Sequence, residues 1–315
     1  MGRSVTPRVC VVGAANIDLI SYVPRLPELG ETLHGTQFRL GYGGKGANQA
    51  VMAAKLGAEV AMVTKLGQDT FGDGTLENLR SHGVDTSYVT TTDQASSGVA
   101  PIFVQPSGDN AIVIVTGAND LISEEEIEQA RPAMARAGVV VCQLEIPIET
   151  TLLALRTARA QGARTVLNPA PARADLPDEL LRLSDVFCPN QGETALLTDR
   201  RVNTVAEAAE AAGLLRERGA GSVVVTLGVD GCLVLDEDGL DHLPGESVEA
   251  VDTTGAGDAF VGALATFLAR GDSLRDSARW ANRVAALSVR GHGTQTSFPE
   301  KADLPDDLLA VLHRE

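Results

Sequence analysis

Short runs of apolar, mostly β-branched residues recur along this chain, and segments with helical spacing separate most of them. The runs cover residues 9–13, 60–67, 139–145, 165–168, 185–188 and 222–228. Continuous apolar strands that alternate with helices are typical of a parallel sheet covered by helices on both faces. The pattern therefore predicts an α/β fold with a mostly parallel central sheet.

Two segments, residues 17–41 and 98–116, break this alternation. Their apolar stretches are joined by Pro- and Gly-containing turns, which favour antiparallel hairpins. We expect a small antiparallel β lid, inserted at two places into a single domain of residues 1–315. An uncovered face of such a lid would be a surface for forming a homodimer. After residue 256 the pattern is helical.

Composition and charge narrow the class of protein. The 315 residues are 44% apolar and 22% charged, which is typical of a soluble globular protein. The 42 acidic residues outnumber the 26 basic ones and give a net charge of -16, which repels nucleic acid and anionic membranes. No apolar stretch reaches membrane-spanning length and the first residues lack a signal-peptide pattern, so we expect a cytoplasmic protein. The cysteines show no CxxC spacing and are expected to be buried free thiols: Cys10, Cys142, Cys188 and Cys232.

Polar residues follow the ends of the predicted strands. In an open parallel sheet, ligands bind beyond the carboxyl ends of the strands, where helix N-termini also point. A single Asn or Asp at such a position is usually a turn or cap residue, but several on one edge indicate a binding site. The residues in question are Asn16, Asp18, Glu145, Asn168, Asn190, Glu193, Leu227 and Gly228.

The first glycine-rich segment, residues 41–57, contains a formal G-x-G-x-x-G match at Gly41, Gly43 and Gly46. It follows the predicted lid rather than the first strand and no acidic ribose ligand follows it, so it is a weak dinucleotide fingerprint. Glycines allow close approach to a polyhydroxyl ligand, and Asn48 and Lys45 offer donors at a helix start. The alternative is a tight turn that needs left-handed glycines.

The second glycine-rich segment precedes a long Ala-rich helix. Backbone N–H groups at Gly255, Ala256 and Gly257 would form an anion hole at the first turn of that helix. Asp258 lies at the same helix start, where the helix dipole stabilises its ionised form, so it can accept a proton from a nearby hydroxyl as a general base. A charge–dipole role alone is the alternative for Asp258.

Asn190 and Glu193 have the spacing of a helix capping box, and the same oxygens could organise a hydrated Mg²⁺ on a triphosphate. Spacing alone leaves both interpretations open. The pairs Thr204/Glu207 and Ser123/Glu126 have this spacing away from any strand end, and there we expect caps only.

These motifs together resemble the ribokinase/phosphofructokinase-B family of sugar kinases. The segment DTTGAGDAFVGAL is similar to the highly specific C-terminal signature of the family, and GGKGANQA, QLEIP, NPAPA and PNQGET also resemble family motifs. The resemblance spans essentially the whole chain, from AANID to GTQTSFP. It implies a Rossmann-like, three-layer αβα fold and ATP-dependent phosphorylation of the 5-hydroxyl of D-ribose.

The resemblance also implies roles for individual residues. Asp258 would be the base, with the anion hole at Gly255, Ala256 and Gly257. The sugar would contact Asp258 and also Asn16, Asp18, Gly44, Lys45, Gly46, Asn48 and Glu145. The nucleotide and its Mg²⁺ would be served by Asn190, Glu193, Thr226, Gly228, Gly231, Gly257 and Asn282. A monovalent cation, K⁺, would lie near Asp252, Thr254, Ser288, Gly291, Gly293 and Ser297.

Other functions remain open at this point. A sister kinase for 2-deoxyribose, fructose or a nucleoside would use the same core on any well-placed primary hydroxyl. An NAD-dependent oxidoreductase would explain the first glycine-rich segment. A non-catalytic sugar sensor would have no use for Asp258 and its Gly-Ala-Gly neighbours.

Overall fold

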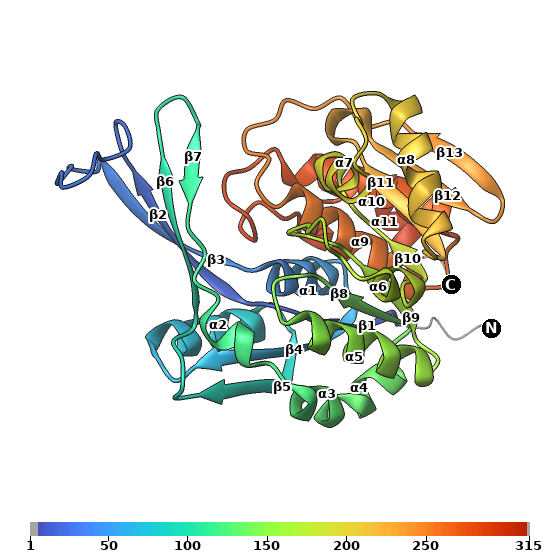
Figure 1. The fold of residues 1–315 in the computed structure, drawn as a ribbon, viewed down its shortest axis with the longest axis horizontal. Coiled ribbons are helices and arrows are strands. Elements are labelled where there is room, and N and C mark those ends of the chain that lie inside the picture. The colour runs from blue at the N-terminus through green and yellow to red at the C-terminus, as the bar shows by residue number, and fades with distance from the viewer. Residues whose placement is uncertain (1–5, 314–315) are drawn as a thin grey trace.

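A computed structural model describes residues 6–313, and the predicted domain of residues 1–315 extends beyond the described residues at both ends (Figure 1). Within them, the larger sheet has the strand order β13-β12-β11-β10-β9-β8-β1-β4-β5. Pairing is parallel from β5 through to β11 and antiparallel at β12 and β13. The strands are β1 (Arg8–Val12), β4 (Glu59–Gly67), β5 (Asp85–Thr92), β8 (Val139–Cys142), β9 (Arg164–Leu167), β10 (Val186–Phe187), β11 (Ser222–Thr226), β12 (Cys232–Asp236) and β13 (Gly239–Leu243). The predicted α/β class with a mostly parallel sheet is confirmed.

Each of the six predicted apolar runs forms a parallel strand of this sheet, whereas β5, β12 and β13 lie outside the predicted set. Strand β5 is at one edge, pairs with β4 alone, and is rich in threonine rather than in a continuous apolar run. At the other edge, β12 and β13 form a hairpin beside β11. The edge strands β5 and β13 are buried on fewer sides, so their sequences carry a weaker apolar signal. Strand β12 has neighbours on both sides and is apolar and buried, so its signal is present in the sequence, although the predicted runs do not include it.

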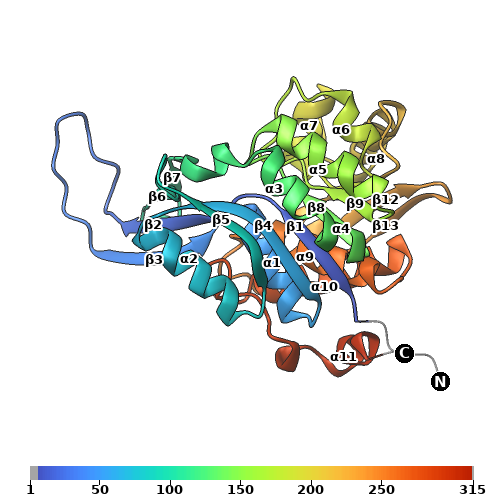
Figure 2. The same ribbon diagram turned by 90° about the horizontal axis from the view of Figure 1, so that it is seen from below.

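Helices cover both faces of the larger sheet, which gives three layers (Figures 1 and 2). One apolar cluster packs under α1 (Lys45–Lys55), α2 (Thr70–Ser81), α9 (Ala256–Ala269), α10 (Leu274–Ser288) and α11 (Asp306–Leu312). A second packs under α3 (Glu124–Gln129), α4 (Arg131–Arg136), α5 (Ile148–Ala160), α6 (Asp178–Arg182), α7 (Gln191–Thr198) and α8 (Val205–Glu217). Among residues 6–313, no helix combines the length and apolarity that a membrane crossing requires. The short 3₁₀ helices are η1 (Gly117–Leu121), η2 (Gly228–Asp230) and η3 (Lys301–Asp303).

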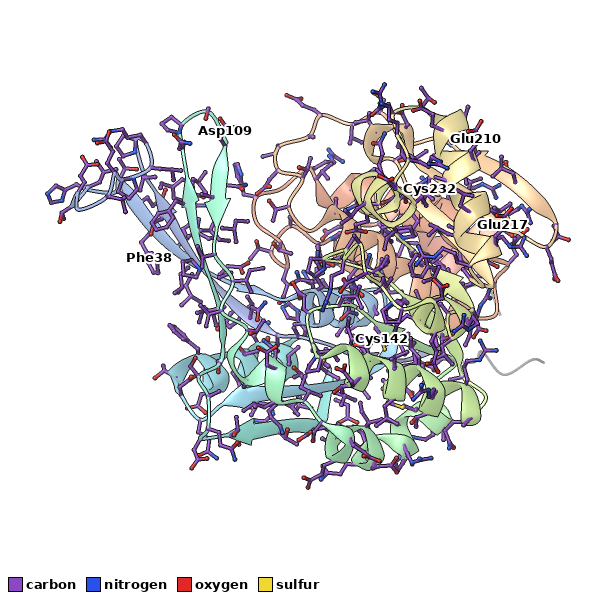
Figure 3. The ribbon with its side chains drawn as sticks, viewed as in Figure 1. Phe38, Asp109, Cys142, Glu210, Glu217 and Cys232 are labelled. Atoms are coloured by element: carbon purple, nitrogen blue, oxygen red, sulfur yellow. The ribbon has the colours of Figure 1, made fainter. Side chains whose placement is uncertain are left out.

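Local predictions about caps and thiols are confirmed. Ser123 with Glu126 and Thr204 with Glu207 form capping boxes at the starts of α3 and α8. The four cysteines are free and buried, and Figure 3 shows two of them, Cys142 in β8 and Cys232 in β12. Burial raises the pKa of both of these thiols, so they remain protonated near neutral pH.

The smaller sheet has the order β3-β2-β6-β7 and projects from one end of the molecule (Figure 1). Its strands are β2 (Asn16–Tyr22), β3 (Gln37–Gly43), β6 (Gly98–Val104) and β7 (Asn110–Ile112). The hairpins β2–β3 and β6–β7 are antiparallel, as the turns predict, but the two hairpins meet through a parallel β2–β6 pair. Residues 105–109 form the β6–β7 turn, and the PSGDN segment runs from Pro106 in this turn to Asn110 at the start of β7.

Candidate active site

Polar residues from distant parts of the chain meet at the carboxyl edge of the larger sheet. A cavity of about 180 Å³ lies there, between the starts of α1, α7 and α9. Its wall is formed by Lys45, Asn168, Ala170, Cys188, Asn190, Glu193, Thr226, Gly255, Gly257, Asp258 and Val261. A larger cavity, of about 690 Å³, includes Asn16 and Glu145 in its wall.

Asp258 is the third residue of α9, and only 7% of it is exposed. Gly255 caps this helix in the left-handed region at φ 81°, where a Cβ atom would also lie 2.4 Å from Thr294 Cγ2. Both carboxylate oxygens accept an amide N–H from α1: Asn48 Nδ2 donates to Oδ2 and Gln49 Nε2 donates to Oδ1, each at 2.9 Å. The carboxylate is therefore held at a helix start, where the helix dipole favours negative charge.

The Gly-Ala-Gly turn presents its backbone to the same cavity. Gly255 and Gly257 are in the cavity wall beside Asp258. The N–H of Ala256 already donates to the carbonyl of Thr253 at 3.2 Å. The N–H groups of the first helical turn, including that of Gly257, have no intrahelical acceptor and are suited to an anion.

Carboxylates and one ammonium group share the neighbouring part of the site. The backbone N–H of Lys45, rather than its ammonium group, donates to Glu145 Oε2 at 2.7 Å. Burial raises the pKa of Glu145 to about 7, although nearby Lys45 opposes the rise. The negative charge of Asp258 raises the pKa of Lys45 and outweighs the effect of burial. Lys45 is therefore cationic at neutral pH, whereas Glu145 titrates close to it.

Asp18 lies on β2 facing the glycines of β3. Burial, and secondarily the charge of Asp258, raises the pKa of Asp18 to about 6. A Cβ atom on Gly43 would lie 2.5 Å from Asp18 Oδ1, so only glycine leaves room for this carboxylate. Asn16, at the start of β2, is oriented by Asn119 Nδ2, which donates to its Oδ1 at 2.8 Å. The Asp18 carboxylate is an acceptor suited to hydroxyl groups, and Asn16, whose oxygen is engaged by Asn119, has its amide N–H groups left to donate.

The glycines of the first glycine-rich segment serve packing rather than a dinucleotide fingerprint. Gly41 and Gly43 belong to β3, next to Asp18. A Cβ atom on Gly46 would lie 2.7 Å from the carbonyl carbon of Gly13, so glycine permits the close approach of α1 to the end of β1. Gly44, at φ 83°, caps α1.

Asn190 and Glu193 form the capping box of α7 and also line the cavity. Glu193 N donates to Asn190 Oδ1, and Asn190 N donates to Glu193 Oε2, each at 2.8 Å. Burial raises the pKa of Glu193, partly offset by the backbone hydrogen bond and by Lys45. Thr226, at the end of β11, pairs with Asn190 and lies in the same wall.

Three further residues predicted for the nucleotide lie outside this cavity wall. Gly231, at φ 88°, follows η2, and a Cβ atom there would lie 2.2 Å from the carbonyl oxygen of Leu243. Asn282, on α10, donates to that same Leu243 oxygen at 3.1 Å. Gly228 begins η2 at φ 61°. These three residues therefore gather around the β11–β13 region, beside the cavity rather than in it.

The residues predicted for a monovalent cation come together in two adjacent segments. The Asp252 carboxylate accepts from the N–H of Thr254 and from that of Gly293, each at 2.9 Å. Burial alone would raise the pKa of Asp252, but these hydrogen bonds outweigh it and lower the pKa. Lys55, the last residue of α1, donates to the carbonyls of Gln295 and Phe298, each at 3.0 Å. These two hydrogen bonds connect the segment of residues 288–298 to the end of α1. The other members, Ser288, Gly291 and Ser297, lie in or beside this segment.

Several site residues escaped the sequence analysis. Gln49, Gln143 and Gln295 are buried in the hydrogen-bonded surroundings of Asp258, and Cys188 lines the cavity. Gln143 is a polar residue at the end of an apolar run, a signal that could have been used. Burial raises the pKa of the Cys188 thiol, so this residue is a poor nucleophile.

Comparisons with known proteins place the chain among sugar kinases. The model of the pfkB family of carbohydrate kinases matches residues 6–301. The ribokinase of Mus musculus is 48% identical over 94% of this chain and 93% of its own length. The deoxyribokinase of Salmonella typhi is 42% identical over 92% of this chain and 95% of its own. A structure of Arabidopsis thaliana ribokinase complexed with ribose and ATP is 31% identical, has a TM-score of 0.89, and covers 99% of this chain and 100% of that one.

Proposed function

This chain belongs to the pfkB family of carbohydrate kinases, and we propose that it transfers the γ-phosphoryl group of ATP to the 5-hydroxyl of D-ribose. Relatives named ribokinase, and the neighbouring structure with ribose and ATP, support this choice of substrates. The observation that carries the proposal is the position of Asp258 beside the Gly255–Gly257 turn in one cavity. 2-Deoxyribose is the second candidate, because a deoxyribokinase is among the similar relatives.

In the proposed mechanism, Asp258 accepts the proton of the attacking hydroxyl, and the first turn of α9 stabilises the charge of the migrating phosphoryl group. Phosphoryl transfer requires positioning and charge neutralisation more than covalent catalysis. Gly257 is the best placed donor for the anion hole, with Gly255 giving the turn its shape. The N–H of Ala256 already donates to the carbonyl of Thr253, so Ala256 helps to shape the turn of the anion hole and leaves the donation to Gly257.

The sugar is proposed to lie between Asp258 and β2. Asp18 is the acceptor for its hydroxyl groups, because no donor among the described residues reaches this half-buried carboxylate. Lys45 supplies the donors, and Glu145 accepts. The remaining contacts come from the surrounding backbone and amides, at Asn16, Gly44, Gly46 and Asn48.

The nucleotide is proposed to occupy the part of the cavity lined by α7 and β11. Its phosphates would lie near Asn190, Glu193 and Gly257. Its adenine ring would lie toward Thr226, Gly228, Gly231 and Asn282. Among residues 6–313, no cluster of three or more His, Cys, Asp or Glu residues could hold a metal. Glu193 lies in the cavity wall beside Asn190, and its carboxylate fits a Mg²⁺ ion that is held mainly by phosphates and water; the ion would neutralise phosphate charge.

The Asp252 region fits a monovalent cation, because the ligand atoms that it offers are hard oxygens. One of them belongs to the Asp252 carboxylate, whose lowered pKa keeps it charged. Asp252 and Thr254 would hold K⁺ with Ser288, Gly291, Gly293 and Ser297, several through their carbonyls. The cation would supply positive charge near the anion hole.

We expect faster turnover in K⁺ than in Na⁺ at constant ionic strength. Initial rates in the two salts measure this, and Asp252→Asn should reduce the difference between them. Equal rates for the unaltered protein would remove the proposed cation site.

The smaller sheet is proposed to act as a lid over the sugar, formed by residues 17–41 and 98–116 within one kinase domain. Closure would exclude water and limit ATP hydrolysis. Its outer face exposes apolar side chains, including Phe38, which is 60% exposed and is labelled in Figure 3. Similar exposure on this face is found at Leu40, Val113 and Val115, whereas Ile112 and Ile114 alternate with them on the opposite face, the face of Asp18. An exposed apolar face of this kind supports a homodimer through the lid.

Changing Phe38 and Leu40, which lie on the same face of β3, together to aspartate should convert the dimer into a monomer, because two charges would be buried in its interface. Light scattering coupled to size-exclusion chromatography measures the mass. Leu240→Asp, at an exposed residue of β13, is the control and should remain dimeric. A monomeric unaltered protein would contradict the proposal.

The substrate proposal is tested by ADP release with D-ribose, 2-deoxy-D-ribose, D-fructose and a nucleoside, each with ATP and Mg²⁺ in K⁺ buffer. We expect the highest kcat/KM with D-ribose. A higher value with 2-deoxy-D-ribose would favour the second candidate, and no sugar-dependent ADP release would contradict the kinase proposal.

A further inference from the structure

The carboxylate of Asp258 lies at the meeting point of two chains of side-chain amides. Asn48 and Gln49 are adjacent on α1, and each donates to a different oxygen of this carboxylate at 2.9 Å. Each of these amides is in turn bonded to further amides. An amide has a donor end and an acceptor end, so each bond in such a chain determines which end the next residue presents.

The first chain reaches Asp258 through Asn48. Gln295 Nε2 donates to Asn48 Oδ1 at 2.9 Å, which leaves the donor end of Asn48 facing the carboxylate. Asn78 Nδ2 donates to Gln295 Oε1 at 2.8 Å and orients Gln295 in the same way. All donors in this chain therefore point toward Asp258.

The second chain reaches Asp258 through Gln49. Gln143 Nε2 donates to Gln49 Oε1 at 2.6 Å, so the donor end of Gln49 faces both Asp258 and Asn168 Oδ1. Asn168 presents that oxygen because its Nδ2 donates to the carbonyl of Cys188 at 2.9 Å. Gln49 is thus fixed from two directions.

Burial makes these hydrogen bonds strong and the orientation of each amide costly to reverse. Gln49 is 0% exposed and Gln143 is 1% exposed. Gln143 Oε1 is buried and has no hydrogen-bond partner in the part of the chain that the structure describes. Turning Gln143 over would face its oxygen toward the Gln49 oxygen, so its present orientation sacrifices one acceptor to keep the donors directed at Asp258.

We propose that Gln49 is a positioning residue for phosphoryl transfer, which holds the Asp258 carboxylate with Asn48 and is itself oriented by Gln143. This inference rests on the proposed role of Asp258 as the base. With one lone pair of each oxygen engaged by α1, the others are directed at the sugar hydroxyl before substrate binds. A catalytic group held in this way needs little reorganisation to reach its reactive geometry.

A double-mutant cycle tests the proposal, with kcat and the KM for ribose measured for Gln49→Met, Asp258→Asn and the double variant. Methionine keeps the length and approximate volume of glutamine but cannot donate. We expect Gln49→Met to lower kcat about 10-fold or more with a much smaller change in KM. In the Asp258→Asn background the same change should lower kcat by less than about twofold, because the residue acts through Asp258.

Thr165→Val is the matched control, since Thr165 is equally buried and hydrogen-bonded. It lies near the start of the central strand β9, whereas the candidate site lies beyond the carboxyl ends of the strands. The substitution should lower thermal stability and leave kcat unchanged. If Gln49→Met does not fold, Gln143→Met replaces it in the cycle, because it leaves Gln49 free to turn over. We expect a smaller fall in kcat, which again disappears in the Asp258→Asn background.

An equal fall in kcat in both backgrounds would mean that Gln49 has only a structural role, and an unchanged kcat would overturn the proposal directly. Wild-type turnover in Asp258→Asn itself would instead remove the base on which the inference rests. The two failures are therefore distinguishable within one experiment.

Discussion

Asp258→Asn is expected to lower kcat by about 10²-fold or more and to leave the affinity for ribose comparatively intact. Asparagine keeps the size of the side chain but cannot take the proton of the attacking hydroxyl. The sugar would retain its contacts with β2 and with the start of α1. Steady-state kinetics with ribose and ATP measure kcat and KM separately, and a binding titration with ribose measures the affinity.

Asp276→Asn provides a matched control, because Asp276 is the third residue of α10 just as Asp258 is the third residue of α9. The Asp276 carboxylate accepts from the hydroxyl of the N-cap residue Ser273 at 2.9 Å and pairs with Arg279 on the surface. Its replacement should reduce stability slightly and leave kcat unchanged. If the two variants had similar kcat values, Asp258 would have only the charge–dipole role.

Gly44→Ala is expected to destabilise the protein and to raise the KM for ribose. Gly44 has φ 83°, and a Cβ atom there would lie 2.7 Å from Ala15 Cα and from Asn16 N, both of which are backbone atoms. Backbone strain alone should lower the free energy of unfolding by about 1–3 kcal/mol. Relief of the clash must displace Asn16 or the start of α1, both of which belong to the proposed sugar site. Denaturant unfolding and steady-state kinetics measure the two effects.

Gly162→Ala separates the effect of backbone strain from the effect of the clash with neighbouring backbone atoms. Gly162 has almost the same φ, 82°, but a Cβ atom there meets nothing within 4 Å. This control should lose stability through strain and keep a normal KM. If Gly44→Ala lost no more stability than Gly162→Ala and bound ribose normally, close packing at Gly44 would have no role in the site.

The sequence allowed the centre of the fold and many residues of the candidate site to be predicted, because both depend on local patterns; the structure brings several of these residues together in one cavity. A buried parallel strand such as β8 has to be continuously apolar, and its carboxyl end is where Glu145 then appears. The start of α9 was likewise readable from its glycines and Asp258. Edge strand β5 was missed because a strand with one neighbour can be built from threonine.

Contacts between residues distant in sequence could not be predicted in this way. The parallel β2–β6 pair joins residues about eighty positions apart, and neither strand carries a signal for the other. The same holds for the amides around Asp258: Gln49 is 209 residues away from it, and Gln295 is 247 residues away from Asn48. A buried glutamine has no characteristic spacing, so only the folded chain identifies its partner.

Helix α1 has a consequence for how ligands can influence one another. Its 11 residues span about 16 Å, and they connect β3 at one end, through Gly44, with the carbonyls of Gln295 and Phe298 at the other, through Lys55. A displacement at either end would shift Asn48 and Gln49 between them. Any improvement in sugar affinity that a cation brings about through this helix must therefore be matched by an equal improvement in cation affinity when sugar is bound, since thermodynamic linkage is reciprocal.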